Sequence, residues 1–105
     1  MLIERYLSDE VLEDSDQHCP LYALPADVVR AGPEPQRAYT AVLHGMAGVL
    51  RRALPDGCPD ADTRVQLIVT LCVGSMVLAR ATHDPALSKA VRATARKQAL
   101  ALLAA

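Results

Sequence analysis

The sequence predicts an all-α protein, an antiparallel bundle of about four helices near residues 20–31, 35–54, 61–81 and 85–104. Three observations support this fold class. Hydrophobic residues make up 51% of the chain, yet it holds no Phe, no Trp and only three Tyr, so Ala, Leu and Val, common in helical bundles, fill the core. Apolar residues recur at three- and four-residue steps, and no run alternates as a strand does. A length of 105 residues favours one domain, 1–105.

The chain begins with MLIERYL, which reads as the last two turns of a helix, and residues 8–19 read as an acidic loop. The first complete helix is expected over 20–31. Pro20 suits a first helical position, and a Gly-Pro pair ends the segment. Pro25 lies inside this helix and is expected to bend or interrupt it, because proline lacks a backbone donor.

The second helix, 35–54, has one apolar face and ends at Pro55. The opposite side carries polar residues such as Arg37, His44 and Arg51. The face toward the core follows helical spacing and consists of Tyr39, Val42, Leu43, Met46, Val49, Leu50 and Ala53.

The third helix, 61–81, is apolar on two opposite sides, which is unusual for a chain of this size. One face consists of Val65, Ile68, Val69, Cys72, Met76 and Ala79, and the other of Leu67, Leu71, Gly74 and Leu78. A helix that is apolar on two sides must be covered on two sides. The second helix can cover one side, and a partner subunit is the natural cover for the other, although burial within one monomer is the alternative. Glycine weakens a helix by about 1 kcal/mol against alanine, which is consistent with a neighbouring helix passing close to Gly74.

The fourth helix, 85–104, begins with a cap at Asp84 and with Pro85 in its first position. Lys89, Arg92 and Arg96 are expected to form a solvated basic face. The opposite face, which we expect to be buried, has mostly small side chains that allow close helix packing; its members are Leu87, Ala90, Val91, Thr94, Gln98, Ala101 and Leu102.

Three stretches resemble one family of regulators. VGSMVLARATHDPALSKAVRATARK (73–97) resembles the last two helices of tetracycline-repressor-like (TetR) transcriptional regulators, where a pattern like G-A-x-x-L-A-R-A precedes D-P-x-L-S and a basic, alanine-rich helix. RYLSDE (5–10) and HCPLYALPADVVRAGPEPQRAYT (18–40) are similar to an earlier part of one subgroup. The pieces follow the family's order between residues 5 and 97, although His18 and Pro25 depart from the pattern.

The resemblance implies the regulatory and dimerisation region of such a protein. The last two helices would form a four-helix bundle with their symmetry mates in a homodimer. The interface would use side chains of both helices: Leu67, Leu71, Gly74, Leu78, Leu87, Val91, Thr94, Gln98 and Leu102. The family's N-terminal helix-turn-helix has no counterpart in these residues, so the chain is expected to reach DNA only through a domain outside them. A fragment of a longer regulator is the favoured explanation, and a stand-alone module that forms heterodimers with full-length regulators is the alternative.

A small apolar effector is the expected ligand. Tyr22, Tyr39, Leu43 and Met46 are candidates to line its pocket, with a phenol as the polar handle. The alternative is that these four residues are simply part of the core.

Other functional classes have weaker support. No Ser/His/Asp spacing or Gly-rich phosphate loop suggests an enzyme, and no C-x-x-C spacing suggests a metal or another cofactor. A thiol sensor at Cys19, beside His18, is a second alternative. A net charge of −1, from 11 basic and 12 acidic residues, gives no reason to expect a nucleic-acid surface. Three cysteines, no signal peptide and no apolar stretch of about 20 residues favour a reduced, cytoplasmic protein without a membrane span.

Overall fold

The computed structural model describes residues 2–14, 16 and 18–104, and these form helices without any strand. The all-α prediction is therefore confirmed for this part of the chain. The helices are α1 (Leu2–Tyr6), α2 (Asp9–Glu13), α3 (Pro20–Ala23), α4 (Pro25–Ala31), α5 (Pro33–Ala53), α6 (Ala61–Ala81) and α7 (Pro85–Ala104).

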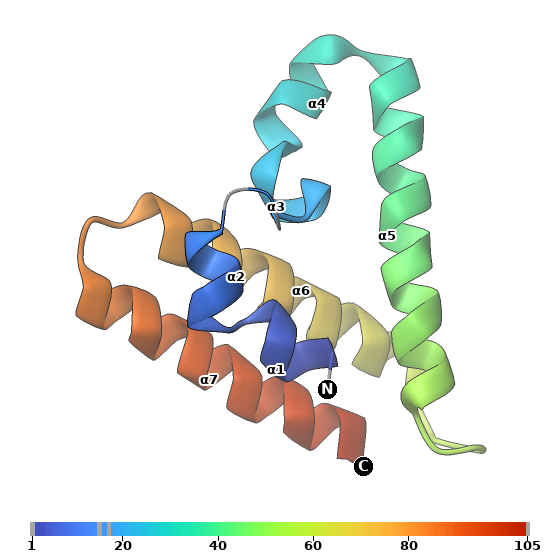
Figure 1. The fold of residues 1–105 in the computed structure, drawn as a ribbon. Helices are drawn as coiled ribbons and strands as arrows, with labels where there is room; N and C mark the ends of the chain where they lie inside the picture. The colour runs from blue at the N-terminus through green and yellow to red at the C-terminus, as the bar shows by residue number, and fades with distance from the viewer. Residues whose placement is uncertain (1, 15, 17, 105) are drawn as a thin grey trace.

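The last two long helices form an antiparallel hairpin, and α6 is the centre of the molecule (Figure 1). The short helices α1 and α2 lie across this hairpin, and α3 and the C-terminal end of α5 pack on α6. The core collects around the face of α6 that these elements cover. Its largest fully buried side chains are Ile3, Leu21, Leu50, Ile68, Cys72 and Met76.

The upper half of α5 and all of α4 form an arm that extends away from the hairpin (Figure 1). The two helices are joined at Gly32, whose φ of 104° is a conformation that glycine adopts without a steric penalty. Within the predicted apolar face of α5, Leu50 is buried, whereas Val42 and Val49 are 40% and 44% exposed. The core-facing prediction for this helix therefore holds at its C-terminal end, near Leu50.

One local prediction needs correction. The stretch predicted as a loop contains α2, because Ser8 caps it: the backbone N–H of Val11 donates to the Ser8 hydroxyl at 3.2 Å. The interruption expected at Pro25 is confirmed: the helix over 20–31 is divided at Leu24, and Pro25 is the first residue of a new helix. The bundle therefore has more helices than the predicted four.

The start of α7 follows the prediction. The Asp84 carboxylate accepts from the backbone N–H groups of Ala86 and Leu87 at 3.0 and 3.2 Å, and Pro85 is the first helical residue.

The face that α7 turns toward the core differs from the prediction. Buried positions on this helix are Ser88, Arg92, Ala95 and Ala99, and none of these belongs to the face predicted to be buried. Leu87, a member of that predicted face, is 50% exposed. The predicted solvated position of Arg92 is also wrong, since this side chain lies under α1 and α2.

Among the described residues, one helix, α6, is long and apolar enough to cross a membrane by length and composition, with 21 residues and a mean hydropathy of 1.5. The sequence was expected to contain no apolar segment long enough for a membrane span, but α6 reaches that length because the helix includes polar residues as well as apolar ones. The same two properties are shared by core helices of water-soluble proteins, and the inner face of α6 is buried by its own chain.

Candidate functional site

Helix α6 is covered on one side only. The face predicted to point into the core is buried, from Val65 to Ala79. On the opposite face, Leu67 is 46% exposed and Leu78 is 59% exposed. An exposed pair of leucines on one helix face is a feature of interaction surfaces when further apolar groups adjoin it.

The outer face of α6 meets α7 in an apolar groove of about 360 Å³. Gly74 lies on its floor, and a Cβ atom built there would find no atom within 4 Å. The absence of a side chain at Gly74 is therefore not required by packing among the described residues. The groove is lined by Thr70, Leu71, Gly74, Ser75, Leu78, Ala90, Val91, Thr94 and Ala95.

The residues predicted to form a dimer interface divide into two groups. Leu71, Gly74, Leu78, Val91 and Thr94 line the groove. Others lie outside it: Leu67, Leu87 and Gln98 are exposed, and Leu102 is half-buried against the core.

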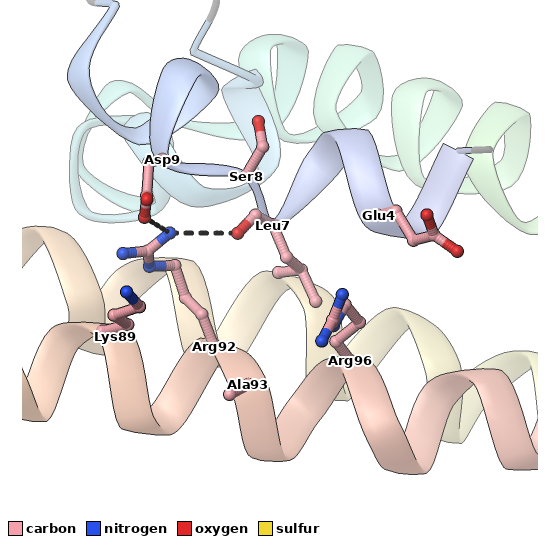
Figure 2. A pocket seen from close by; sticks show the side chains of 8 residues that line it. All are labelled: Glu4, Leu7, Ser8, Asp9, Lys89, Arg92, Ala93 and Arg96. Atoms are coloured by element: carbon pink, nitrogen blue, oxygen red, sulfur yellow. Dashed lines mark hydrogen bonds and ion pairs between the residues drawn. The ribbon is translucent and has the colours of Figure 1, made fainter.

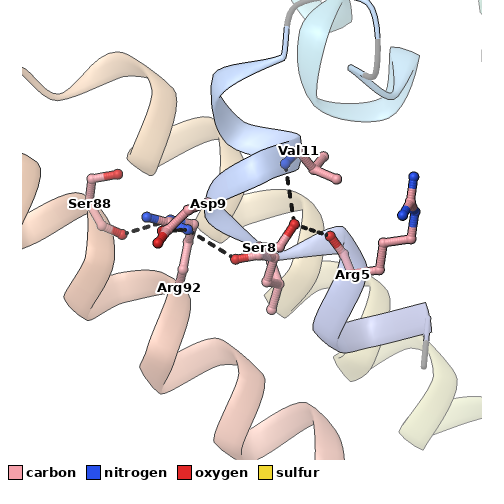
Figure 3. A network of polar contacts seen from close by, with 7 residues as sticks. Arg5, Ser8, Asp9, Val11, Ser88 and Arg92 are labelled. Atoms are coloured by element: carbon pink, nitrogen blue, oxygen red, sulfur yellow. Dashed lines mark hydrogen bonds and ion pairs between the residues drawn. The ribbon is translucent and has the colours of Figure 1, made fainter.

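A second feature joins the two ends of the chain. The Arg92 guanidinium donates to the Leu7 carbonyl oxygen at 3.1 Å and pairs with the Asp9 carboxylate at 2.8 Å (Figures 2 and 3). Its Nε also donates to the Ser88 carbonyl oxygen at 3.3 Å. Arg92 thereby holds the junction of α1 and α2 against α7.

A hollow of about 280 Å³ lies beside this contact (Figure 2). It is lined by acidic side chains, Glu4 and Asp9, and by basic ones, Lys89, Arg92 and Arg96. Because acidic and basic side chains both line this hollow, it favours neither an anionic nor a cationic ligand. We interpret it as part of the contact between α1, α2 and α7.

The four predicted effector-binding residues do not line one cavity. Tyr39 lies beside α4, where its hydroxyl donates to the Leu21 carbonyl oxygen at 2.7 Å. Leu43 and Met46 are half-buried against the core. Tyr22 is almost fully buried and lines a different hollow.

Tyr22 belongs to an aromatic cluster that sequence reasoning did not find. Its ring meets the Tyr6 ring edge-on, with centroids 5.6 Å apart, and the His18 ring lies at the same distance. From α6, the Arg80 guanidinium lies 5.4 Å from the centre of the Tyr22 ring and donates to the Tyr22 carbonyl oxygen at 3.4 Å. The sequence contains no signal for this cluster, because Tyr6 and Tyr22 lie far apart in the chain and on different helices.

The two phenols border a small hollow of about 130 Å³, whose lining consists of Leu2, Arg5, Tyr6, Val11, Cys19 and Tyr22. Among the described residues, neither the Tyr6 hydroxyl nor the Tyr22 hydroxyl has a hydrogen-bond partner, although both oxygen atoms are buried. Buried hydroxyls without partners are rare in proteins. Because both oxygen atoms have almost no accessible surface, the hydroxyl groups do not open into the hollow.

Burial dominates the protonation of these groups. Loss of solvent raises the pKa of Tyr6 far above its usual value, and the adjacent Cys19 thiol raises it further. Burial also raises the pKa of Tyr22. Both phenols therefore stay neutral and keep a proton to donate.

The sulfur and imidazole groups are found in different contacts. Cys19 is half-buried at the start of α3, and the His18 Nε2 atom lies 3.1 Å from the Leu12 carbonyl oxygen. Cys72 is buried. No group of three or more His, Cys, Asp or Glu side chains among the described residues could hold a metal ion.

Comparison of the chain with known protein families, with curated proteins and with solved structures finds no match.

Proposed function

We propose that this chain is the dimerisation and effector-binding region of a transcriptional regulator similar to the TetR family. Support comes from the sequence resemblance of 73–97 to the last two helices of those regulators and from the helical hairpin over the same residues. In this proposal a separate domain reads DNA, because basic and acidic residues are balanced in this chain, 11 against 12.

The observation that carries the proposal is the uncovered side of α6. Leu67, Leu78 and Leu87 are each about half exposed, and the groove between α6 and α7 is apolar. A second copy related by a two-fold axis would lay the same two helices over this face, so each copy would cover the other. Pairing of this kind should bury more than about 1,000 Å², the area of a specific interface.

Gly74 gives this proposal a sharp test. A Cβ atom at this position has no neighbour within 4 Å in one copy of the chain, and arginine is a better helix former than glycine. Gly74→Arg should therefore fold, but its charged side chain would enter the space that the partner needs.

Sedimentation equilibrium over a range of protein concentrations measures the outcome. Wild type is expected to dimerise and Gly74→Arg to stay monomeric, with an unchanged helical circular dichroism spectrum. The matched control is Val29→Arg, which places the same charge on α4 at a residue that is 67% exposed and outside the groove. A monomeric wild type, or a Gly74→Arg variant that dimerises as well as the control, would contradict the proposal.

A further inference from the structure

We propose that one exposed face of α5 binds the same face of a second copy of this chain, with the two helices antiparallel. No residue of this face lines the groove between α6 and α7. The inference therefore goes beyond the proposed function, because the second surface joins two of the proposed dimers into a tetramer. The outer face of α5, as we name it, consists of Glu34, Ala38, Ala41, Gly45, Gly48 and Arg52.

The outer face of α5 is uncovered in one copy of the chain. Helix α5 contacts α3, α4 and α6, and α3 and α4 lie on one side of it (Figure 1). These contacts use the opposite face, where Leu50 is buried and the Tyr39 hydroxyl donates to α3. Every residue of the outer face except Gly48 is exposed, and Val42 and Val49 beside it are 40% and 44% exposed. This side of α5 is therefore open to a partner.

The spacing of the outer face suits the pairing of two helices. Its residues follow one another at alternating steps of four and three, which are the a and d positions of a seven-residue repeat that forms a seam between helices. Between its two ends the seam holds only Ala and Gly, and small side chains allow two helix axes to approach to about 8 Å. A Cβ atom at Gly45 would have no neighbour within 4 Å. Close approach of a second α5 accounts for this open space.

The charges at the two ends of the seam select the antiparallel direction. Glu34 lies in the first turn of α5 and Arg52 in its last turn, about 27 Å apart at a rise of about 1.5 Å per residue, so they do not pair within one copy. Neither of them makes an ion pair with any residue that the structure describes. When Ala41 of one copy lies beside Gly45 of the other in an antiparallel pair, each Glu34 meets an Arg52. A parallel pair would bring like charges together at both ends.

The size of the outer face indicates weak pairing. Helix α5 has 21 residues, and one pair of helices of this length buries less than the roughly 1,200 Å² of a stable interface. Pairing through α5 therefore needs higher protein concentrations than the proposed dimer of α6 and α7. Gly74→Arg stays monomeric at the concentrations that populate this dimer and pairs through α5 only above them.

Gly45→Arg tests the surface. Sedimentation equilibrium of wild type at increasing concentrations is expected to show dimers first and tetramers next. Gly45→Arg places a charge in the seam and should weaken the second step by at least about tenfold, with an unchanged helical circular dichroism spectrum. The matched control is His44→Arg, which adds the same side chain at the adjacent exposed residue on the polar side of α5 and should form tetramers like wild type. Equal tetramer formation by the two variants, or a wild type without tetramers, would overturn the inference.

Charge reversal tests the antiparallel direction in a Gly74→Arg background, where α5 supplies the only proposed contact. Glu34→Arg and Arg52→Glu each bring like charges together at both ends of an antiparallel pair, so each variant should pair more weakly than the background protein. An equimolar mixture of the two variants places opposite charges at both ends and should recover the pairing. Mixing cannot restore a purely local effect of either charge on its own helix end. A mixture that pairs no better than its components would overturn the inference.

The same measurements separate this inference from the proposed function. A wild type that stops at the dimer, together with a Gly74→Arg variant that is monomeric at every concentration, would remove the α5 surface alone. Pairing that is lost in Gly45→Arg and kept in Gly74→Arg would remove the proposed dimer of α6 and α7 alone.

Discussion

Asp9 and Arg92 lie at opposite ends of the chain, and their side chains meet at 2.8 Å. The two partners differ in environment: the Arg92 side chain is 8% exposed, whereas the Asp9 side chain is 63% exposed. Asp9 also lies in the first turn of α2, where a negative charge is favourable. The contact therefore fastens the first two helices to the last helix (Figure 3).

Arg92→Ala is expected to lower the free energy of unfolding by about 3 kcal/mol, because it leaves the Leu7 carbonyl oxygen without its charged donor and opens space beneath α1. Urea unfolding followed by circular dichroism measures this loss. Arg96→Ala, an exposed change on the same helix, should stay within about 0.5 kcal/mol of wild type. Equal effects of the two variants would show that Arg92 has no anchoring role.

The Arg92–Asp9 contact also predicts a dependence of stability on pH. Arg92 lowers the pKa of Asp9 below its usual 3.8, first by hydrogen bonding and then by its charge. A carboxyl whose pKa is lowered by folding stabilises the fold above the unfolded pKa, and this contribution is lost as pH falls through the folded pKa. Urea unfolding from about pH 6 to about pH 2 measures this dependence. The free energy of unfolding of wild type should exceed that of Asp9→Asn near neutral pH, and this difference should disappear below pH 3.8. A gap that stays constant in acid would contradict the assignment to Asp9.

Gly74→Ala separates the folding of one copy from its pairing. At protein concentrations low enough to keep the chain monomeric, this variant should gain about 1 kcal/mol of stability, because alanine favours the helix and no atom lies within 4 Å of the new Cβ. At higher concentrations its dimer should be weaker than that of wild type, since a methyl group occupies the close approach. Loss of stability in the monomer would mean that the groove floor is already crowded.

Tyr22→Phe is expected to stabilise the ligand-free protein by about 1 kcal/mol, because it removes a buried hydroxyl that has no partner among the described residues and keeps the ring under Arg80. Thermal unfolding measures the change. Tyr39→Phe should instead lower the stability, because it removes a hydroxyl that donates a hydrogen bond of 2.7 Å to the Leu21 carbonyl oxygen. A loss of stability in both variants would show that the Tyr22 hydroxyl is satisfied in solution.

Cys72 should resist alkylation in the native protein. Its side chain has no exposed surface, and burial raises the pKa of its thiol to about 11. Iodoacetamide labelling followed by mass spectrometry should modify Cys19 and Cys58 in the folded chain and Cys72 only after addition of urea. Labelling of Cys72 at the rate of the other two would contradict its place in the core.

Much of the fold was predictable because helical periodicity and proline positions act locally. The bounds of α6 and α7 and the inward face of α6 follow from such signals. The split at Pro25 has the same origin. The exposure of Leu67 and Leu78 was also predictable, since a short chain offers little to cover a second apolar face.

The rest depends on contacts between distant segments, which a helical wheel does not contain. Arg92 was predicted to lie on a solvated face, but its side chain pairs with the Asp9 carboxylate and donates to the Leu7 carbonyl oxygen at the other end of the chain. As a result, the face of α7 that points inward is not the predicted one. It consists of Ser88, Arg92, Ala95 and Ala99. The pairing of Tyr6 with Tyr22 was hidden for the same reason, since it depends on how α1 and α3 meet.

The arm formed by α4 and the upper half of α5 has a consequence for how the molecule opens. None of the residues of α4 is buried, and α5 has its buried anchor, Leu50, near its C-terminal end. Segments with little buried surface detach at a fraction of the global unfolding free energy. We therefore expect amide protons of α4 and the first half of α5 to exchange with deuterium through local unfolding of the arm. Amide protons near Cys72 should exchange only through global unfolding.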